Sequence, residues 1–456
     1  MNRRRIFADG LLERSSLKLA EILGFAPQSS RPLPRGTAHT AKKTIALCHS
    51  LLSERGEVSG SRLAAEALDS YKALDNRARR AFFESLIREF SPDPEEVGRA
   101  GDAYRDDPSA ENLARLQRVV EPPRQELFRR LNLAPDGTRI LVAMRSQVLQ
   151  ESDRTSRLKP IAADLAHLFT SWFNRGFLVL RRIDWRTSAV VLEKLIQYEA
   201  VHQIQGWHDL RRRLESDRRC YAFFHPALPD EPIIFIEVAL TRGLSETVQA
   251  LLDPDSPVLD VESAEWAIFY SITNCQDGLR GVPFGSFLIK RVVENLSKEL
   301  PRIRKFATLS PVTGFRKWLS DKAAAMNASS KLAPFAAAVT KLDDPQWMDD
   351  AELRAELPRC LLPLAAYYLL HARQNDEPLD AVARFHLKNG ARLERINWLG
   401  DTSASGLQRS AGLTANYVYK LAEVERNHEL YVREHKVRAS REIETLAKRF
   451  PAPARF

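Results

Sequence analysis

Hydrophobic residues recur every three or four positions through the first third of the chain. The pattern is clearest over Arg62–Tyr71 and Arg77–Phe90. This spacing places apolar side chains on one face of a helix. Turn-forming residues interrupt the pattern at Pro27–Pro34, Ser91–Pro94, Pro122–Pro123 and Pro135–Gly137. We therefore predict an almost wholly helical region from about Leu11 to Phe173.

After Gly176 the pattern changes to short runs rich in β-branched and aromatic residues, which are typical of strands. A turn at Leu228–Pro232 is expected to join two of the strands as a hairpin. With helices between the strands, the sequence predicts an α+β protein with a helical domain at 1–172 and a mixed-sheet domain at 173–456. The expected strands are 177–185, 220–225, 232–241, 266–273, 306–309 and 392–398.

The length and composition of the chain indicate a soluble protein with more than one domain. A chain of 456 residues, 44% hydrophobic, is long enough for two or three domains with cores of their own. No apolar run approaches the roughly 18 to 20 residues of a membrane span, and Asp9 and Glu13 interrupt the N-terminal segment where a secretory signal would be apolar. Four widely spaced cysteines suggest reduced thiols and no metal site. We expect a soluble cytoplasmic protein without a membrane partner.

The formal charge of +9 raises the possibility of a nucleic-acid partner. Charges of both signs are interspersed along the helical patterns, however, and no basic stripe alternates with aromatic residues as in single-strand binders. A basic surface also attracts small anionic ligands. We therefore predict no nucleic-acid partner.

A predicted strand at 266–273 runs into a glycine-containing turn and then an amphipathic helix at 284–299. Arg280, Gly281 and Gly285 stand before that helix, where backbone N–H groups and the helix dipole favour anions. The turn lacks the Lys-Ser/Thr ending of a P-loop and the Gly-x-Gly-x-x-Gly spacing of a dinucleotide site, so ATP and NAD are poor candidates. A strand, turn and helix without a ligand is the alternative.

Two further residues are candidates for catalysis. Ser310 follows the predicted strand 306–309, at the edge where open sheets bind ligands, or it caps the next helix. His386 lies in an apolar stretch before a turn at Asn389-Gly390. It is either a buried structural histidine or a proton donor.

The anion loop is similar to the coenzyme A loop of the GNAT N-acetyltransferase superfamily, with Pro283 in place of the middle glycine. Over a longer range the chain resembles the malonyl-CoA decarboxylase family. The resemblance rests on ordered blocks that include Glu199–His202, Arg218–Tyr221, Ala267–Ile272, Gly285–Val293, Leu309–Pro311, Phe385–Ala391, Arg395–Trp398 and Asn416–Tyr419.

The resemblance implies a helical N-terminal domain and a GNAT-like catalytic domain that converts malonyl-CoA to acetyl-CoA and CO₂. Because the helical region 1–172 contains amphipathic helices and no catalytic constellation, we expect it to be an oligomerisation domain. The resemblance also implies a homo-oligomer, dimer or tetramer, acting in fatty acid metabolism without a metal or organic cofactor. The implied catalytic residues are Ser310, His386 and Tyr419. Malonyl-CoA would bind to Ser310, His386 and the loop Arg280, Gly281, Val282, Pro283, Phe284, Gly285 and Ser286.

One departure matters for the histidine. Animal members of the family carry a glutamate where this chain has Pro283. A role for that carboxylate in orienting the histidine therefore does not transfer, and His386 needs another partner or none.

The expected chemistry explains the residue types. Loss of CO₂ from a malonyl thioester leaves an enolate, so the site must stabilise charge on the thioester oxygen and deliver a proton to C2. A cation on the carboxylate would stabilise the ground state, which favours neutral donors such as Ser310 and His386. The alternatives are an acyl-CoA-dependent N-acyltransferase, which needs a base for its amine, and a basic helical binding protein.

Two other groups of residues receive weaker interpretations. His428, Glu429 and His435 lack the spacing of a zinc helix, so we expect a solvated helical face. The basic runs Arg211–Arg213 and Arg218–Arg219 could reach coenzyme phosphates, but a solvated charge run is the expectation we favour.

Overall fold

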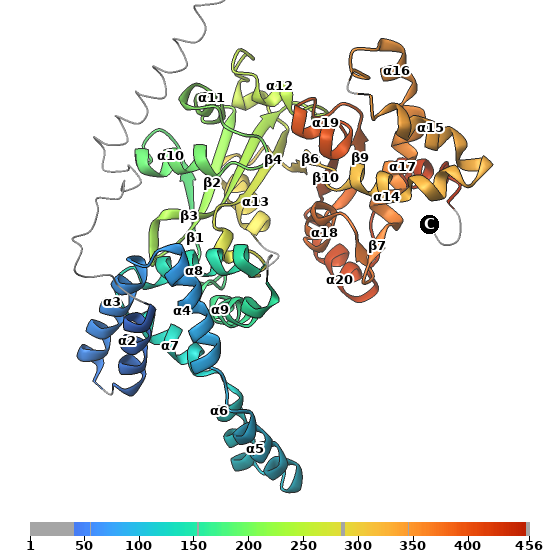
Figure 1. Cartoon of the computed structure of the whole chain (residues 1–456). Helices are drawn as coiled ribbons and strands as arrows, with labels where there is room; N and C mark the ends of the chain where they lie inside the picture. The colour runs from blue at the N-terminus through green and yellow to red at the C-terminus, as the bar shows by residue number, and fades with distance from the viewer. Residues whose placement is uncertain (1–40, 55, 153–154, 284–287, 345, 453–456) are drawn as a thin grey trace, which may run out of the picture. The chain divides into compact units, whose positions relative to one another are not determined.

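The computed structural model describes residues 41–54, 56–152, 155–283, 288–344 and 346–452 (Figure 1). Its contacts divide the chain into two compact units between Gly137 and Thr138.

The first unit is helical, as predicted. Its buried core includes the aromatic residues Tyr71, Phe82, Phe83 and Phe128. The ring centroids of Tyr71 and Phe82 are 5.3 Å apart. Asp75 caps one helix by accepting a hydrogen bond from Ala78 N at 2.7 Å. The helices are α2 (Ala41–Ser53), α3 (Glu57–Lys72), α4 (Asn76–Glu89), α5 (Pro94–Asp106), α6 (Ala110–Val120) and α7 (Pro123–Leu131).

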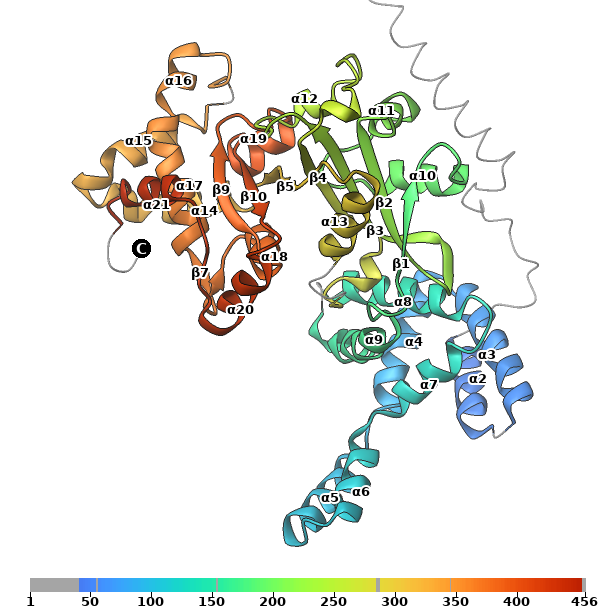
Figure 2. The same cartoon turned by 180° about the vertical axis from the view of Figure 1, so that it is seen from behind.

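The second unit opens with two helices, α8 (Gly137–Ser152) and α9 (Lys159–Trp172), and continues into a mixed sheet (Figure 2). The strand order is β1-β2-β3-β4-β5-β10-β6, and β9 pairs with β10. Only the β4–β5 pair is parallel among the described strands of this sheet. The strands are β1 (Val179–Ile183), β2 (Arg218–His225), β3 (Leu228–Thr241), β4 (Trp266–Asn274), β5 (Lys305–Thr308), β6 (Ser310–Pro311), β9 (Arg392–Asn397) and β10 (Thr414–Tyr419).

β3 is buried without interruption from Pro232 to Leu240, so both faces of the sheet are covered there. Phe235 packs with Val191 and Leu195 of α10 (Ala189–Tyr198) on one face. Ile234 and Ile236 point to the opposite face, where α13 (Leu288–Glu299) lies. Further short helices on the sheet are α11 (Trp207–Arg213) and α12 (Gln249–Leu252).

The chain after β6 adds a helical layer and a small hairpin, β7 (Arg373–Gln374) and β8 (Glu377–Pro378). The helices are α14 (Phe315–Asn327), α15 (Ala333–Lys341), α16 (Ala351–Glu356), α17 (Pro358–His371), α18 (Ala381–Lys388), α19 (Ala404–Ser410), α20 (Val424–Glu434) and α21 (Arg441–Lys448).

The predicted fold class, a helical region followed by a mixed sheet with flanking helices, is confirmed. The predicted turn at Leu228–Pro232 is wrong. These residues belong to β3, and the chain reverses between His225 and Leu228, which are paired. The start of the predicted helix at 284 and the predicted helix near Leu11 lie outside the described residues. No helix of the described residues is long and apolar enough to cross a membrane.

Candidate active site

Ser310 lies in β6, where it pairs with Ala415 of β10. Its side chain is buried, with 6% exposed. The alternative role as a helix cap is wrong, because the next helix, α14, begins at Phe315 and its N-cap is Gly314.

His386 lies on α18, a helix that the sequence fixes at both ends. Asp380 caps its start by accepting a hydrogen bond from Ala383 N at 2.7 Å, and the chain leaves it at Gly390 with φ +82°. The imidazole is buried and stacks on the ring of Tyr417, with centroids 4.8 Å apart.

The structure brings the three predicted catalytic residues into one hydrogen-bonded chain. Nε2 of His386 lies 3.1 Å from Oγ of Ser310, and Nδ1 lies 2.8 Å from the hydroxyl oxygen of Tyr419. This protein has Pro283 where the animal relatives have a loop carboxylate. The hydrogen bond at Nδ1 shows that His386 has Tyr419 as its partner instead.

The direction of these hydrogen bonds follows from Thr308. Its Oγ1 accepts from the backbone N–H of Tyr417 at 3.2 Å and from the hydroxyl of Ser310 at 3.0 Å. Because the single hydroxyl proton of Ser310 points to Thr308, the bond to His386 requires a proton on Nε2. Nδ1 is then an acceptor, and the phenol of Tyr419 donates to it.

Burial keeps the side chains of His386 and Tyr419 uncharged. It lowers the pKa of His386 to about 3 and raises the pKa of Tyr419 well above its ordinary value. At neutral pH the imidazole is therefore neutral and the phenol keeps its proton. Ser310, His386 and Tyr419 form a series of neutral donors.

Ser310 and His386 open into a cavity of about 260 Å³. Its walls are mainly apolar and include Ile236, Phe269 and Phe385. Besides the catalytic candidates, Ser271 and Asn274 also line it, and among the described lining residues there is no Asp, Glu, Lys or Arg. An anion in this cavity would exchange its hydration for neutral donors.

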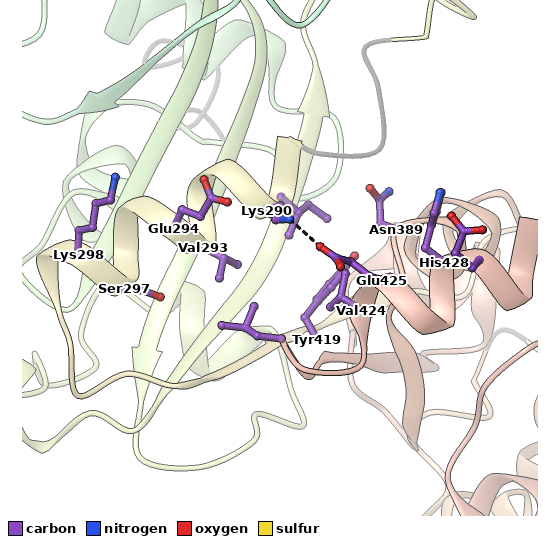
Figure 3. Close-up of a pocket in the computed structure, with 13 residues that line it drawn as sticks. Lys290, Val293, Glu294, Ser297, Lys298, Asn389, Tyr419, Val424, Glu425 and His428 are labelled. Atoms are coloured by element: carbon purple, nitrogen blue, oxygen red, sulfur yellow. Dashed lines mark hydrogen bonds and ion pairs between the residues drawn. The ribbon is translucent and has the colours of Figure 1, made fainter.

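A second, larger cleft of about 750 Å³ lies between α13 and α20 (Figure 3). Tyr419 lines this cleft, so the hydrogen-bonded chain has one end at each cavity. Ile289 of α13 lines both. At the rim, Lys290 Nζ lies 3.3 Å from Glu425 Oε1, as the dashed line in Figure 3 marks.

The predicted anion loop follows β4 and lies partly within the described residues. Arg280 and Gly281 are exposed, Val282 is buried and Pro283 is exposed. Gly281 has φ +80°, a conformation that favours glycine. Phe284, Gly285 and Ser286 lie outside the described residues.

The two basic runs are mostly neither solvated nor directed at a ligand. Four of their arginines form buried or half-buried ion pairs, with N–O distances of 2.7 Å for Arg212–Asp217, 2.7 Å for Arg213–Glu237, 2.9 Å for Arg218–Asp217 and 2.8 Å for Arg219–Glu299. The predicted solvated charge run is therefore wrong for these residues. His428 lines the larger cleft, and no cluster of metal-binding side chains exists among the described residues.

Sequence reasoning missed Thr308, Tyr417 and Asp380. Thr308 carried a usable signal, because residues two apart on a strand share a face and Thr308 is two positions before Ser310. Asp380 carried another, as a capping residue at the start of the helix with His386. The contact of Tyr417 with His386 depends on the fold and left no local signal.

Comparison with known proteins identifies the family of this chain. The family model for the malonyl-CoA decarboxylase C-terminal domain matches residues 176–454, and that for the N-terminal domain matches residues 90–173. The protein is thus a carbon–carbon lyase of the carboxy-lyase class. The chain belongs to the malonyl-CoA decarboxylase family, which confirms the predicted resemblance.

Individual relatives cover most of the chain. The mitochondrial malonyl-CoA decarboxylase of Anser anser anser is 34% identical over 433 residues, which are 87% of this chain and 85% of the relative. The crystal structure of malonyl-CoA decarboxylase from Rhodopseudomonas palustris matches with a TM-score of 0.85 and 49% identity, covering 89% of this chain and 99% of the other. That from Cupriavidus metallidurans matches with a TM-score of 0.71 and 34% identity, covering 90% and 100%.

Proposed function

We propose that this protein converts malonyl-CoA to acetyl-CoA and CO₂ with Ser310 and His386 as its proton-transfer pair. The observation that carries the proposal is their 3.1 Å contact at the wall of a 260 Å³ cavity without charged lining residues in the described chain. Family membership supports the substrate and the reaction class.

In the proposed reaction the malonyl group enters this cavity and its carboxylate meets apolar walls and neutral donors. The carboxylate is no better stabilised there than in water, whereas the thioester enolate left by CO₂ is a stronger hydrogen-bond acceptor. As the oxyanion develops, it replaces Oγ of Ser310 as the acceptor of the Nε2–H of His386. The hydroxyl of Ser310 turns from Oγ1 of Thr308 and becomes the second donor to the oxyanion. One such donor accelerates a reaction by about 10²- to 10³-fold.

The enolate then takes one proton at C2. We assign this proton to Nε2 of His386, with Ser310 as its hydrogen-bonding partner, and a solvent proton restores the imidazole between turnovers. The hydroxyl of Tyr419, bonded to Nδ1 at 2.8 Å, offsets the charge left on the ring. The thioester itself accepts the electron pair, so the proposal needs neither a metal nor an organic cofactor.

The loop Arg280–Ser286 is proposed to hold the coenzyme phosphates. Its position between β4 and α13 and the left-handed Gly281 support this role. Cytoplasmic location, homo-oligomeric assembly and a place in fatty acid metabolism stay predictions from the sequence.

The N-acyltransferase alternative has less support. An amine acceptor needs a general base with a pKa near the working pH. The described lining of the smaller cavity offers no carboxylate, and an imidazole with a pKa of about 3 is a weak base.

The test is to incubate the purified chain with malonyl-CoA and to follow acetyl-CoA by mass spectrometry. Stoichiometric acetyl-CoA is expected, and Ser310→Ala serves as the control for background decarboxylation. Unchanged malonyl-CoA with folded protein would refute the proposal.

A further inference from the structure

Arg145 of α8 is a buried arginine that binds the anion loop. Its Nη1 donates to the backbone oxygen of Gly278 at 2.6 Å and to that of Arg280 at 2.9 Å, and its Nε donates to the backbone oxygen of Ala162 at 3.0 Å. The side chain is only 5% exposed. One guanidinium therefore ties the loop to two helices.

The loop also fits closely against α8. A Cβ atom at Gly278 would lie 1.9 Å from the backbone oxygen of Val142, so only glycine allows this approach. This contact places the backbone oxygens of the loop within reach of Arg145.

Arg145 binds the peptide between Arg280 and Gly281, which a turn can hold in either of two opposite orientations. Leu279 to Val282 form a turn closed by a hydrogen bond from Val282 N to Leu279 O at 3.0 Å. Arg280 has φ −57° and ψ 126°, and Gly281 has φ +80°, which are the angles of a type II turn. Type I and type II turns differ mainly by a reversal of the central peptide, which here joins Arg280 to Gly281.

The hydrogen bond from Arg145 selects the type II orientation of the Arg280–Gly281 peptide. In a trans peptide the C=O and the following N–H point in opposite directions, and no cis peptide occurs among the described residues. Because Arg145 holds the oxygen of Arg280, the N–H of Gly281 points away from α8. A reversed peptide would instead turn this oxygen outward, toward any bound anion.

We propose that Arg145 is a positioning residue for coenzyme binding, which holds the Arg280–Gly281 peptide with its N–H directed at a phosphate of the substrate. This rests on the proposed function of the loop. Arg145 itself does not touch the substrate. Its effect is on affinity, because the reacting Ser310 and His386 lie on other elements.

The test uses the full chain with Arg145→Met, Gly281→Ala and the double variant. Alanine disfavours φ +80° but meets no atom within 4 Å, so Gly281→Ala perturbs the same peptide without a clash. A hydrogen bond to a charged group corresponds to about tenfold or more in affinity. Each single variant should therefore raise KM for malonyl-CoA by about tenfold and change kcat by less than about threefold.

The double variant should be little worse than either single variant, because both relax one peptide. Arg145→Lys, which keeps the charge, should recover part of the loss, and Arg157→Met removes an exposed arginine as the matched control. A folded Arg145→Met with normal KM, or single effects that multiply, would overturn the inference. If Arg145→Met does not fold, Arg145→Lys and Gly281→Ala decide by the same readout.

Calorimetric titration with free coenzyme A separates this inference from the proposed reaction. A weaker Kd for coenzyme A in Arg145→Met supports the role of Arg145 even if the wild type makes no acetyl-CoA, a result that would refute the reaction alone. Equal Kd values in the wild type and in Arg145→Met would refute the role of Arg145 alone.

Discussion

Removing Ser310 and His386 singly and together tests whether they act as one unit. In the proposed reaction each has a direct part, and Oγ of Ser310 and Nε2 of His386 are 3.1 Å apart in the cavity wall. Loss of one donor to a developing oxyanion costs about 10²- to 10³-fold in kcat. Ser310→Ala and His386→Asn should each show a loss of this size. The double variant should lose little more, because residues that act together are non-additive.

Stability must be measured on the same samples. Ser310→Ala leaves the Nε2–H of a histidine that is 3% exposed without its partner, which costs about 1–3 kcal/mol in the free energy of unfolding. Turnover by acetyl-CoA formation, melting by circular dichroism and coenzyme A binding by calorimetry separate this cost from catalysis. Ser171→Ala, at an exposed serine, is the matched control.

Two results would contradict the assignment. One is a destabilised but fully active Ser310→Ala, which would leave the serine a structural role. The other is a double variant whose loss equals the product of the two single losses, since that would mean independent contributions.

Four further predictions concern the surroundings of this pair. Tyr419→Phe should lower kcat by about tenfold at nearly unchanged KM, because Nδ1 of His386 loses a donor at 2.8 Å; an unchanged kcat would contradict this. Thr308→Val should lower kcat and Thr308→Ser should preserve it, because only a hydroxyl can accept from Ser310 and Tyr417 N–H; equal activities would exclude the proton order inferred above. The pKa of His386 is about 3 in the folded chain and about 6.5 in an unfolded one, so its stabilising contribution is complete above pH 6.5 and is lost as the pH falls towards 3. His386→Asn should therefore lose less stability than the wild type between pH 7 and pH 5 in denaturant titrations, and a parallel loss would argue against a neutral buried imidazole. A fragment that begins at Pro135 should bind coenzyme A and melt cooperatively, whereas one that begins at Arg175 lacks Arg145 and should bind it at least about tenfold more weakly; equal affinities would contradict the support of the loop by α8.

The sequence predicted the participants of the site better than their arrangement. Ser310 and His386 are 76 residues apart, and the motifs around them were enough to propose both. The tautomer of His386 could not be predicted, because it depends on Thr308, whose oxygen accepts from the backbone of a different strand. A hydrogen-bond direction of this kind exists only once β5, β6 and β10 are paired.

The arginine runs show a second limit. Charge spacing alone cannot distinguish an exposed arginine from one in a buried ion pair. Arg213 is buried because Glu237, 24 residues away on β3, lies 2.7 Å from its Nη1. A buried charge is tolerated only with such a partner, and the partner comes from the sheet topology.

The boundary between the helical region and the sheet domain also depends on contacts that the sequence pattern does not reveal. Periodicity places α8 and α9 with the preceding helices, since helical spacing says nothing about which core a helix joins. In the structure, α8 belongs to the unit that contains the sheet, and Arg145 reaches oxygens of residues 133 and 135 positions further along the chain. The family models meet between residues 173 and 176, so the match to the N-terminal model extends over a helix that supports the proposed coenzyme loop. The division at 172 remains a prediction about folding units, and under the proposed function the hydrogen bonds of Arg145 would make α8 a support of the coenzyme loop rather than part of an accessory domain.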